Sequence, residues 1–269
     1  MEVAPQRFVD DLQASLARRP VRVLDGARMA SVAAVLRVDG DRVRLLFIRR
    51  AVNPRDRWSG QIAFPGGKCE ANETSLETAM REAKEEVGLD LASATWLGQL
   101  PDRVATSGNK MVVSTHVFLW AETAAPSFSL QTSEVSAAFW VDVDHLLTAR
   151  PRELRIRLDA MMRRTSEASL LHRLLCLLGW TTIKFPCIYL PLPHQTCSDD
   201  EASHRGADEY VLWGLTYGMV LDLFKDVPGA RHRPASSLLL VYKHSQRYPL
   251  LVLLHAMSAV LMCYAMAKL

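Results

Sequence analysis

The chain has 269 residues, 49% of them hydrophobic and 23% charged, a composition that provides a sizeable core and excludes an intrinsically disordered protein. The formal net charge is only +3 and no stretch is dense in lysine and arginine, which argues against a nucleic-acid partner. The five cysteines are odd in number and form no C-x-x-C pair, so they indicate a reducing compartment and neither a zinc site nor a disulfide framework.

The N-terminal part predicts one helix and two strands. Residues Gln6 to Arg18 have the periodicity of a short amphipathic helix, without the apolar run of a secretory signal peptide. Ser31 to Val38 and Arg42 to Arg49 alternate as strands on either side of a turn at Asp39 to Asp41.

A second helix is predicted from Thr74 to Val87. The segment is rich in good helix formers, contains neither proline nor glycine, and is followed by Gly88, which can take the positive φ that ends many helices. Ahead of it, Pro65 to Gly67 predicts a tight turn whose main chain can approach a phosphate or offer a carbonyl to a metal. We therefore expect a strand, a glycine turn and an acidic helix in succession.

Three glutamates share one face of this helix. Glu82, Glu85 and Glu86 stand at positions i, i+3 and i+4, so neighbouring Cβ atoms lie about 5 to 6 Å apart. Carboxylates at that separation repel one another unless a cation neutralises them, and Mg²⁺ takes carboxylates, waters and substrate phosphate oxygens as ligands. The alternative is a solvated helix face stabilised by pairs with lysine.

Other residues of the helix fit structural roles. Glu73 and Arg81 are spaced to pair across the loop and the helix, which leaves them outside the predicted catalytic set. Met80, Ala83 and Val87 share a helical stripe that predicts packing in the core.

After the helix, strands and helices continue to alternate. The predicted elements are strands at Thr95 to Leu100, Lys110 to Trp120 and Ala137 to Val143, a helix at Asp144 to Ala149, an insertion at 150–168, a polar loop at Pro193 to Asp208 and an amphipathic helix at Tyr210 to Lys225. This pattern divides the chain into a helical lead-in (1–27), one domain (28–227) and a linker with a tail (228–269).

Residues Gly67 to Leu89 contain the pattern G-x5-E-x7-R-E-U-x-E-E-x-G-U, in which U is a bulky aliphatic residue in the family and Ala83 takes the first of these positions. The segment resembles the Nudix box, the signature of hydrolases that act on a nucleoside diphosphate linked to another group. The resemblance implies an α/β (α+β) fold, a Nudix-type α/β/α sandwich with a mixed sheet. It also implies Mg²⁺ or Mn²⁺ held by the glutamates of the helix, namely Glu82, Glu85 and Glu86.

A further acid follows from the same resemblance. Glu134 falls where many Nudix enzymes carry an acid on a loop facing the metal helix, so it is a candidate ligand or base. The alternative is an ordinary solvated loop residue.

The stretch before the box narrows the range of expected substrates. Leu45 to Lys68 is similar to the coenzyme A pyrophosphatase branch, whose signature reads roughly L-L-T-x-R-[SA]-x3-R-x3-G-x3-F-P-G-G; this chain lacks the threonine and has one extra residue between Arg55 and Gly60. The similarity, which covers about residues 28 to 225, implies hydrolysis of coenzyme A or its acyl esters. The residues that would bind the substrate are Arg50, Arg55, Gly66 and Gly67.

Three alternatives stay open beside this interpretation. The arginines can be a basic surface loop, although guanidinium groups suit a ligand with several phosphates. Another nucleoside diphosphate derivative, such as ADP-ribose or an oxidised nucleotide, can be the substrate. A membrane-tethered module that binds such a ligand without cleaving it belongs to a different class of function.

The tail carries two competing targeting signals. Residues 249–267 are uncharged and, as an extra C-terminal hydrophobic helix, would nearly cross a bilayer core of about 30 Å, with Lys243, Arg247 and Lys268 as flanking charges. A buried terminal helix is the alternative. The final tripeptide, 267–269, resembles the S-K-L type of peroxisomal import signal, which must stay accessible to its receptor.

Overall fold

The computed structural model describes residues 4–24, 26, 28–56, 58–105, 111–120, 127–157, 182–191 and 210–228. Its helices are α1 (Pro5–Arg18), α2 (Ser75–Val87), α3 (Val143–Thr148) and α6 (Gly214–Leu223), with a short 3-10 helix, η1 (Leu91–Ser93). Its strands are β1 (Arg28–Asp39), β2 (Arg42–Arg50), β3 (Ile62–Ala63), β4 (Gly66–Lys68), β5 (Thr95–Ala105), β6 (Met111–Trp120), β7 (Val135–Asp142), β8 (Arg152–Arg157), β9 (Thr182–Tyr189) and β10 (Val211–Trp213).

The predicted polar loop at 193–208 and both targeting signals of the tail lie outside the described residues. Across the described ranges, no helix combines the length and the apolar character needed to cross a bilayer.

A seven-stranded mixed sheet forms the centre of the molecule. Its main path runs β3-β2-β1-β6-β5, while β4 pairs with β1 and β7 pairs with β2. Strand β1 is parallel to β6 and antiparallel to both β2 and β4. This arrangement confirms the expectation of a mixed sheet.

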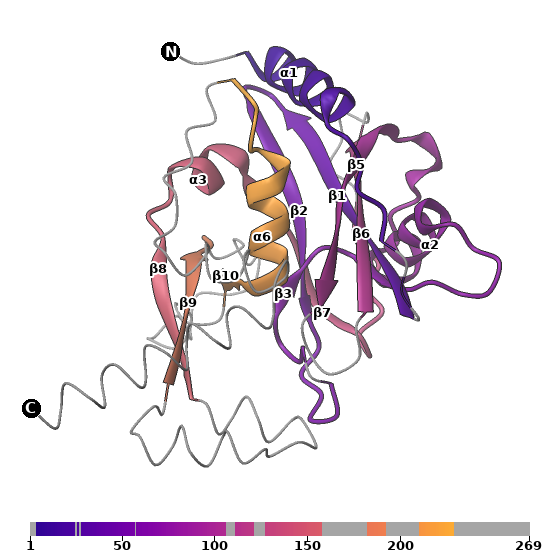
Figure 1. The fold of residues 1–269 in the computed structure, drawn as a ribbon, viewed down its shortest axis with the longest axis vertical. Coiled ribbons are helices and arrows are strands. Elements are labelled where there is room, and N and C mark those ends of the chain that lie inside the picture. Colours follow the sequence, from indigo (N-terminus) through magenta and orange to yellow (C-terminus); the bar gives the residue numbers. More distant parts are fainter. Residues whose placement is uncertain are drawn as a thin grey trace, which may run out of the picture.

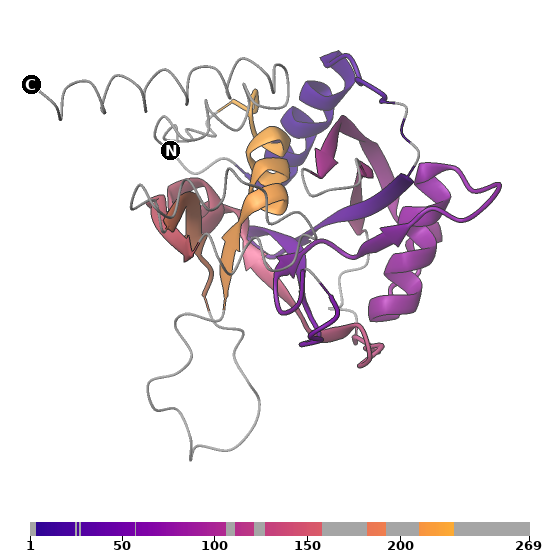
Figure 2. The same cartoon turned by 60° about the horizontal axis from the view of Figure 1, so that its bottom comes forward.

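Helices cover both faces of this sheet (Figure 1). On one face, α2 packs Ala79, Ala83 and Val87 into a buried apolar cluster with residues of β1, β2 and β6. On the other face, α1 and α6 contribute Leu12 and Leu223 to a separate, larger cluster. Figure 2 shows α1 and α6 on the same side of the sheet, with α2 away from them. The predicted α/β/α layering is confirmed, and so is the core position of Ala83 and Val87.

Strands β1 and β2 form the predicted hairpin. Asp39 pairs with Arg42 across the turn, and Gly40 has a φ of 61°, a left-handed conformation that glycine adopts readily. Strand β1 begins at Arg28, earlier than the sequence predicts, because its first residues pair with β6 starting at Met111.

Helix α2 begins and ends at the local signals found in the sequence. The Thr74 hydroxyl accepts the amide N–H of Glu77 at 3.2 Å, and the Glu77 carboxylate accepts the amide N–H of Thr74 at 2.8 Å, which forms a capping box. At the other end Gly88 takes a φ of 74°. Thr74 is therefore the N-cap, and the first helical residue is Ser75.

The prediction of a glycine turn before α2 is wrong. Gly66 to Lys68 form the short strand β4, which pairs with Ala30 to Val32 of β1. Gly66 has a φ of 155°, and a Cβ atom built there would lie 2.6 Å from the Cα atom of Val32. Glycine is thus needed at this position because two strands approach closely, not because the chain reverses.

The prediction of one helix from Tyr210 to Lys225 is also wrong in its first part. Val211–Trp213 is strand β10, which pairs with β9 in a three-stranded sheet of order β10-β9-β8, and α6 starts at Gly214. The start of the predicted insertion forms β8 in the same sheet. Strands β8 and β10 form because they pair with a strand that is distant in the sequence, and local periodicity does not predict such pairing.

Candidate active site

Glu86 lies under strand β4 near the C-terminal end of α2. Its side chain is buried, with 1% of its surface exposed, and one carboxylate oxygen accepts the amide N–H of Gly66 at 2.9 Å. A buried carboxylate with one neutral donor is costly unless further positive charge reaches it. The Glu86 carboxylate therefore needs a positively charged partner in addition to the amide N–H of β4.

Glu82 lies one turn earlier and packs against Gly67. A Cβ atom built on Gly67 would collide with the Glu82 carboxylate, whose carboxyl carbon would be 2.5 Å away. The absence of a side chain at Gly67 is what allows this carboxylate to rest on the main chain of β4. The two sequence-predicted glycines and these two acids thus form one unit, the β4–α2 face, composed of Gly66, Gly67, Glu82 and Glu86.

Burial dominates the electrostatics of the β4–α2 face. Burial raises the pKa of Glu86 to about 7; the Gly66 N–H opposes the rise, Glu82 adds to it, Arg50 opposes it, and Glu134 adds to it. Burial likewise raises the pKa of Glu82, against the effect of Arg81 and with contributions from Glu85 and Glu134. A bound cation would relieve both carboxylates.

Glu134 lies on an exposed loop that is attached to the end of α2. Its carbonyl accepts the amide N–H of Ala51 at 2.7 Å and its own N–H donates to the Gln131 carbonyl at 2.9 Å. The Gln131 N–H in turn donates to the Glu86 carbonyl at 3.0 Å. Glu134 is close enough to Glu82 and Glu86 to contribute to the raised pKa of each, and its role as a ligand or base stays a prediction.

Glu85 is the most exposed of the three helix acids and shares Arg81 with Glu82, which pairs with the same guanidinium group at 3.1 Å. Its side chain is 52% exposed and forms an ion pair with Arg81 at 2.8 Å. Arg81 also donates to Glu73 at 2.7 Å, which is the structural pairing predicted from their spacing, and this contact lowers the pKa of Glu73 to about 2. Arg81 therefore connects helix α2 to Glu73 in the preceding loop and also pairs with Glu85.

The donor set of the β4–α2 face suits a hard divalent cation. Glu82, Glu86 and the nearby Glu134 offer carboxylate oxygens, which Mg²⁺ and Mn²⁺ prefer, and burial disfavours the charged form of Glu82 and Glu86. Among the residues that the structure describes, no group of three or more acidic, histidine or cysteine side chains is arranged to hold a metal ion. The assignment of Glu82, Glu85 and Glu86 as metal ligands stays a prediction.

The two predicted substrate-binding arginines lie in different environments. The Nε and one Nη of Arg50 both donate to one carboxylate oxygen of Asp56, at 2.9 and 2.8 Å. Arg55 is exposed on the loop between β2 and β3. Asp56 is missing from the sequence-predicted site residues, although an acid six residues after Arg50 in a loop is a visible signal.

A buried histidine beside α2 is also missing from the site residues predicted from the sequence. His116 of β6 is 3% exposed and its Nε2 lies 3.0 Å from the hydroxyl oxygen of Ser75, the first residue of α2. Burial lowers the pKa of His116 to about 4, so the ring is neutral at pH 7. No local sequence signal could have found this contact between residues 41 positions apart.

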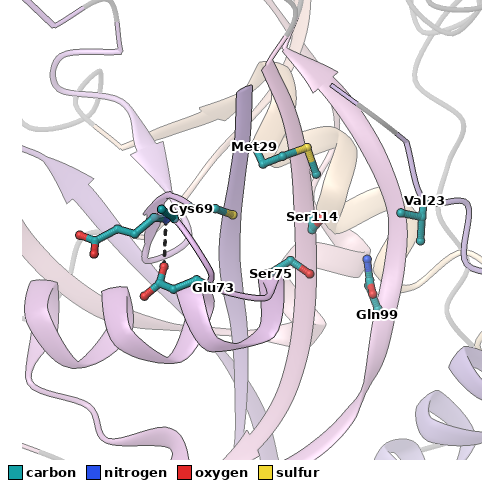
Figure 3. Close-up of a pocket in the computed structure, with 9 residues that line it drawn as sticks. Val23, Met29, Cys69, Glu73, Ser75, Gln99 and Ser114 are labelled. Atoms are coloured by element: carbon teal, nitrogen blue, oxygen red, sulfur yellow. Dashed lines mark hydrogen bonds between the residues drawn. The ribbon is translucent and has the colours of Figure 1, made fainter. Parts of the chain in front are cut away.

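A hollow of about 450 Å³ lies at the other end of α2 (Figure 3). Cys69, Glu73 and Ser75 line it from the loop and the helix start, and Gln99 and Ser114 line it from β5 and β6. The acids of the β4–α2 face do not line it, so this hollow is separate from the candidate active site.

Comparisons with known proteins place the chain in a family. A model of the NUDIX domain family matches residues 27–164, about half of the chain. An uncharacterized protein of Schizosaccharomyces pombe is 37% identical over 121 residues, which cover 43% of this chain and 36% of that protein. Nudix hydrolase 3 of Caenorhabditis elegans is 28% identical over 148 residues, which cover 54% of this chain and 61% of that protein.

The chain therefore covers less than two thirds of the length of either relative. Among solved structures, the NUDIX domain of Shewanella oneidensis NrtR complexed with ADP ribose aligns with a TM-score of 0.37 and 16% identity, over 50% of this chain and 84% of that one. Because that TM-score is low, membership rests on the family match and on the box of acids and glycines. The chain belongs to the Nudix family.

Proposed function

We propose that this protein hydrolyses the pyrophosphate bond of a nucleoside diphosphate derivative with the help of Mg²⁺ or Mn²⁺. The favoured substrate is coenzyme A or an acyl-CoA, and the products are phosphopantetheine, acylated where the substrate is, and adenosine 3′,5′-bisphosphate. The observation that carries the proposal is the β4–α2 face, where the Glu86 carboxylate is buried against the Gly66 N–H beside a partly buried acid, Glu82.

The residues of this face take distinct roles in the proposed reaction. Glu82, Glu85 and Glu86 would hold the cation, which would lower the pKa of water and screen charge on the phosphoryl oxygens. Glu134, or one of the helix acids, accepts a proton from the attacking water. That water adds to one phosphorus of the diphosphate, and the bridging oxygen leaves with the other phosphate.

Positioning of the diphosphate falls to β4 and to the β2–β3 loop. The main chain of Gly66 and Gly67 carries no side chain that would keep a phosphate away from the acids. Arg50 and Arg55 meet the outer phosphates, since guanidinium groups suit oxygen-rich anions. The similarity of residues 45–68 to the coenzyme A pyrophosphatase branch supports coenzyme A over ADP-ribose or an oxidised nucleotide.

A panel of substrates tests this proposal. The full chain with Mg²⁺ or Mn²⁺ is incubated with coenzyme A, acetyl-CoA, ADP-ribose and an oxidised nucleoside triphosphate, with EDTA in parallel reactions, and products are separated by chromatography. We expect the highest kcat/KM for a coenzyme A species and no cleavage with EDTA. Faster cleavage of ADP-ribose or of the oxidised nucleotide would move the chain to the alternative substrate. Binding without cleavage of any member would support the non-catalytic module and overturn the proposal.

The sequence of the tail supports a separate proposal on location. Residues 249–267 act as a membrane anchor, or residues 267–269 act as a peroxisomal signal. Imaging and alkaline extraction of the full chain, beside a variant that lacks only the last three residues, distinguish the two: an anchor persists without the tripeptide, whereas a peroxisomal signal is lost with it.

A further inference from the structure

An exposed tryptophan lies on the loop that joins β2 to β3, residues 51–61. Trp58 has 36% of its surface exposed, whereas most large apolar side chains in the described ranges are buried. An exposed aromatic ring is well suited to stack on a planar ligand.

Hydrogen bonds within this loop fix the main chain at Trp58. The Trp58 amide N–H donates to one carboxylate oxygen of Asp56 at 3.0 Å, and the Trp58 carbonyl accepts the N–H of Gln61 at 3.1 Å. The Asn53 side chain accepts the N–H of Arg55 at 2.9 Å, and the Ser59 hydroxyl accepts the N–H of Asn53 at 2.8 Å. Because the main chain at Trp58 is fixed in this way, the loop itself loses little conformational freedom when a ligand binds.

The same loop is tied to the candidate active site. Asp56 uses one oxygen for the Trp58 backbone and its other oxygen for the Arg50 guanidinium, at 2.8 Å. Arg50 is close enough to Glu86 to lower that acid's pKa. The next residue, Ala51, donates its N–H to the carbonyl of Glu134. One carboxylate therefore links the tryptophan to an arginine that faces the acids.

We propose that Trp58 is the stacking surface for the heteroaromatic base of the substrate, and so determines preference for nucleoside diphosphate derivatives over diphosphates without a base. The inference rests on the proposed function, because it assigns the base of that substrate to the loop whose arginines meet its phosphates. Stacking on an aromatic ring contributes to affinity for any base, so Trp58 selects for the presence of a base and not for its identity.

Calorimetric binding of two ligands tests the assignment. ADP carries a base and a diphosphate, whereas inorganic pyrophosphate carries the diphosphate alone, and both are titrated with Mg²⁺ into the full-length parent, Trp58→Ala, Trp58→Phe and Trp96→Ala. Trp96 is the matched control because it is 50% exposed but lies on β5, at the far end of the sheet path from β3. We expect Trp58→Ala to weaken ADP binding about 10-fold or more and to leave pyrophosphate within about twofold, while Trp58→Phe and Trp96→Ala bind ADP nearly as the parent does.

Several results would overturn the assignment. Unchanged ADP binding by Trp58→Ala, equal losses of ADP and pyrophosphate binding, or a parent protein that binds neither ligand would each do so. If ADP binding depends on Trp58 but no diphosphate is cleaved, the stacking role stands and the proposed hydrolysis fails. If the parent cleaves its substrate and Trp58→Ala cleaves it with the same kcat/KM, hydrolysis stands and the stacking role fails.

Discussion

At the scale of single residues, burial shifts the pKa of two groups near opposite ends of α2. Glu86 is a buried acid whose pKa is raised to about 7, and His116 is a buried base whose pKa is lowered to about 4. Each shift favours the neutral form, because low-polarity surroundings penalise charge. The acid lies on the β4–α2 face, where a cation can compensate it, whereas the histidine has the Ser75 hydroxyl beside its Nε2.

The histidine makes stability depend on pH in a predictable direction. The folded-state pKa of His116, about 4, lies below the ordinary histidine value of 6.5, so the unfolded chain binds a proton that the folded chain excludes. Its contribution is complete above pH 6.5 and is lost as the pH falls toward 4, by at most about 1.4 kcal/mol per pH unit. We expect His116→Gln to be less stable at pH 7 but to lose less further stability between pH 6.5 and pH 4.5.

Urea unfolding of both proteins across that range measures the difference in slope. Glu86, whose raised pKa acts with the opposite sign, is present in both proteins and cancels in the comparison. Equal slopes for the parent and His116→Gln would show that the histidine is not buried as described.

At the scale of elements, β4 and α2 act together because two neighbouring glycines have different tasks. Gly66 lies against the backbone of β1, since its added Cβ would come within 2.6 Å of the Val32 Cα atom. Gly67 lies against the movable end of the Glu82 side chain. A backbone cannot give way cheaply, but a carboxylate can rotate.

The two alanine substitutions should therefore separate stability from activity. Gly66→Ala should lower the melting temperature strongly, because strain at positive φ adds to the collision with β1. Gly67→Ala should keep most of the melting temperature and lower kcat/KM about 10-fold or more by displacing Glu82. Thermal melts and rates on the best substrate of the panel decide this; a stable, fully active Gly67→Ala would contradict the role of Glu82.

The sequence predicts those elements whose ends are marked by local residues, such as turn residues and helix caps. The hairpin turn at Asp39 to Asp41 and helix α2, with Thr74 at one end and Gly88 at the other, follow from local residues alone. Strands β4 and β10 do not, because each exists only through pairing with a strand elsewhere in the chain.

The candidate site divides in the same way. Glu82 and Glu86 are four residues apart in a helix, and this spacing alone is enough to place them on one helix face. The Glu85–Arg81 ion pair is likewise an i,i+4 contact within α2. The contact of His116 with Ser75, 41 positions apart, depends on how separate segments pack, and sequence spacing does not predict it.

At the scale of the whole molecule, the larger apolar cluster extends past the region that the family model matches. The Phe8 and Phe224 rings lie 5.9 Å apart, and Arg103 of β5 donates to Asp222 of α6 at 2.8 Å. Residues 210–228 add Leu212, Val220, Leu223 and Phe224, each with no exposed surface, to the larger cluster.

Truncation at two points tests whether folding depends on this part of the cluster. Removing one large buried side chain costs about 2 to 5 kcal/mol, against a typical total stability of about 5 to 15 kcal/mol. A chain that ends at residue 164, the limit of the family match, should therefore fail to unfold cooperatively. A chain that ends at Pro228 should melt cooperatively and retain kcat, because the described core is complete within it. Cooperative melting of the shorter chain would show that α6 is dispensable.

The most direct measurement of the central claim is the effect of Glu86→Gln on hydrolysis. This substitution keeps the size of the side chain and removes the charge that the β4–α2 face offers to a cation. We predict that kcat/KM for coenzyme A, or for the best substrate of the panel, falls about 100-fold or more with saturating Mg²⁺. The control Glu77→Gln lies on the same helix, where glutamine can also serve in the capping box, and should retain parent activity. Cleavage by Glu86→Gln at the parent rate would contradict the account.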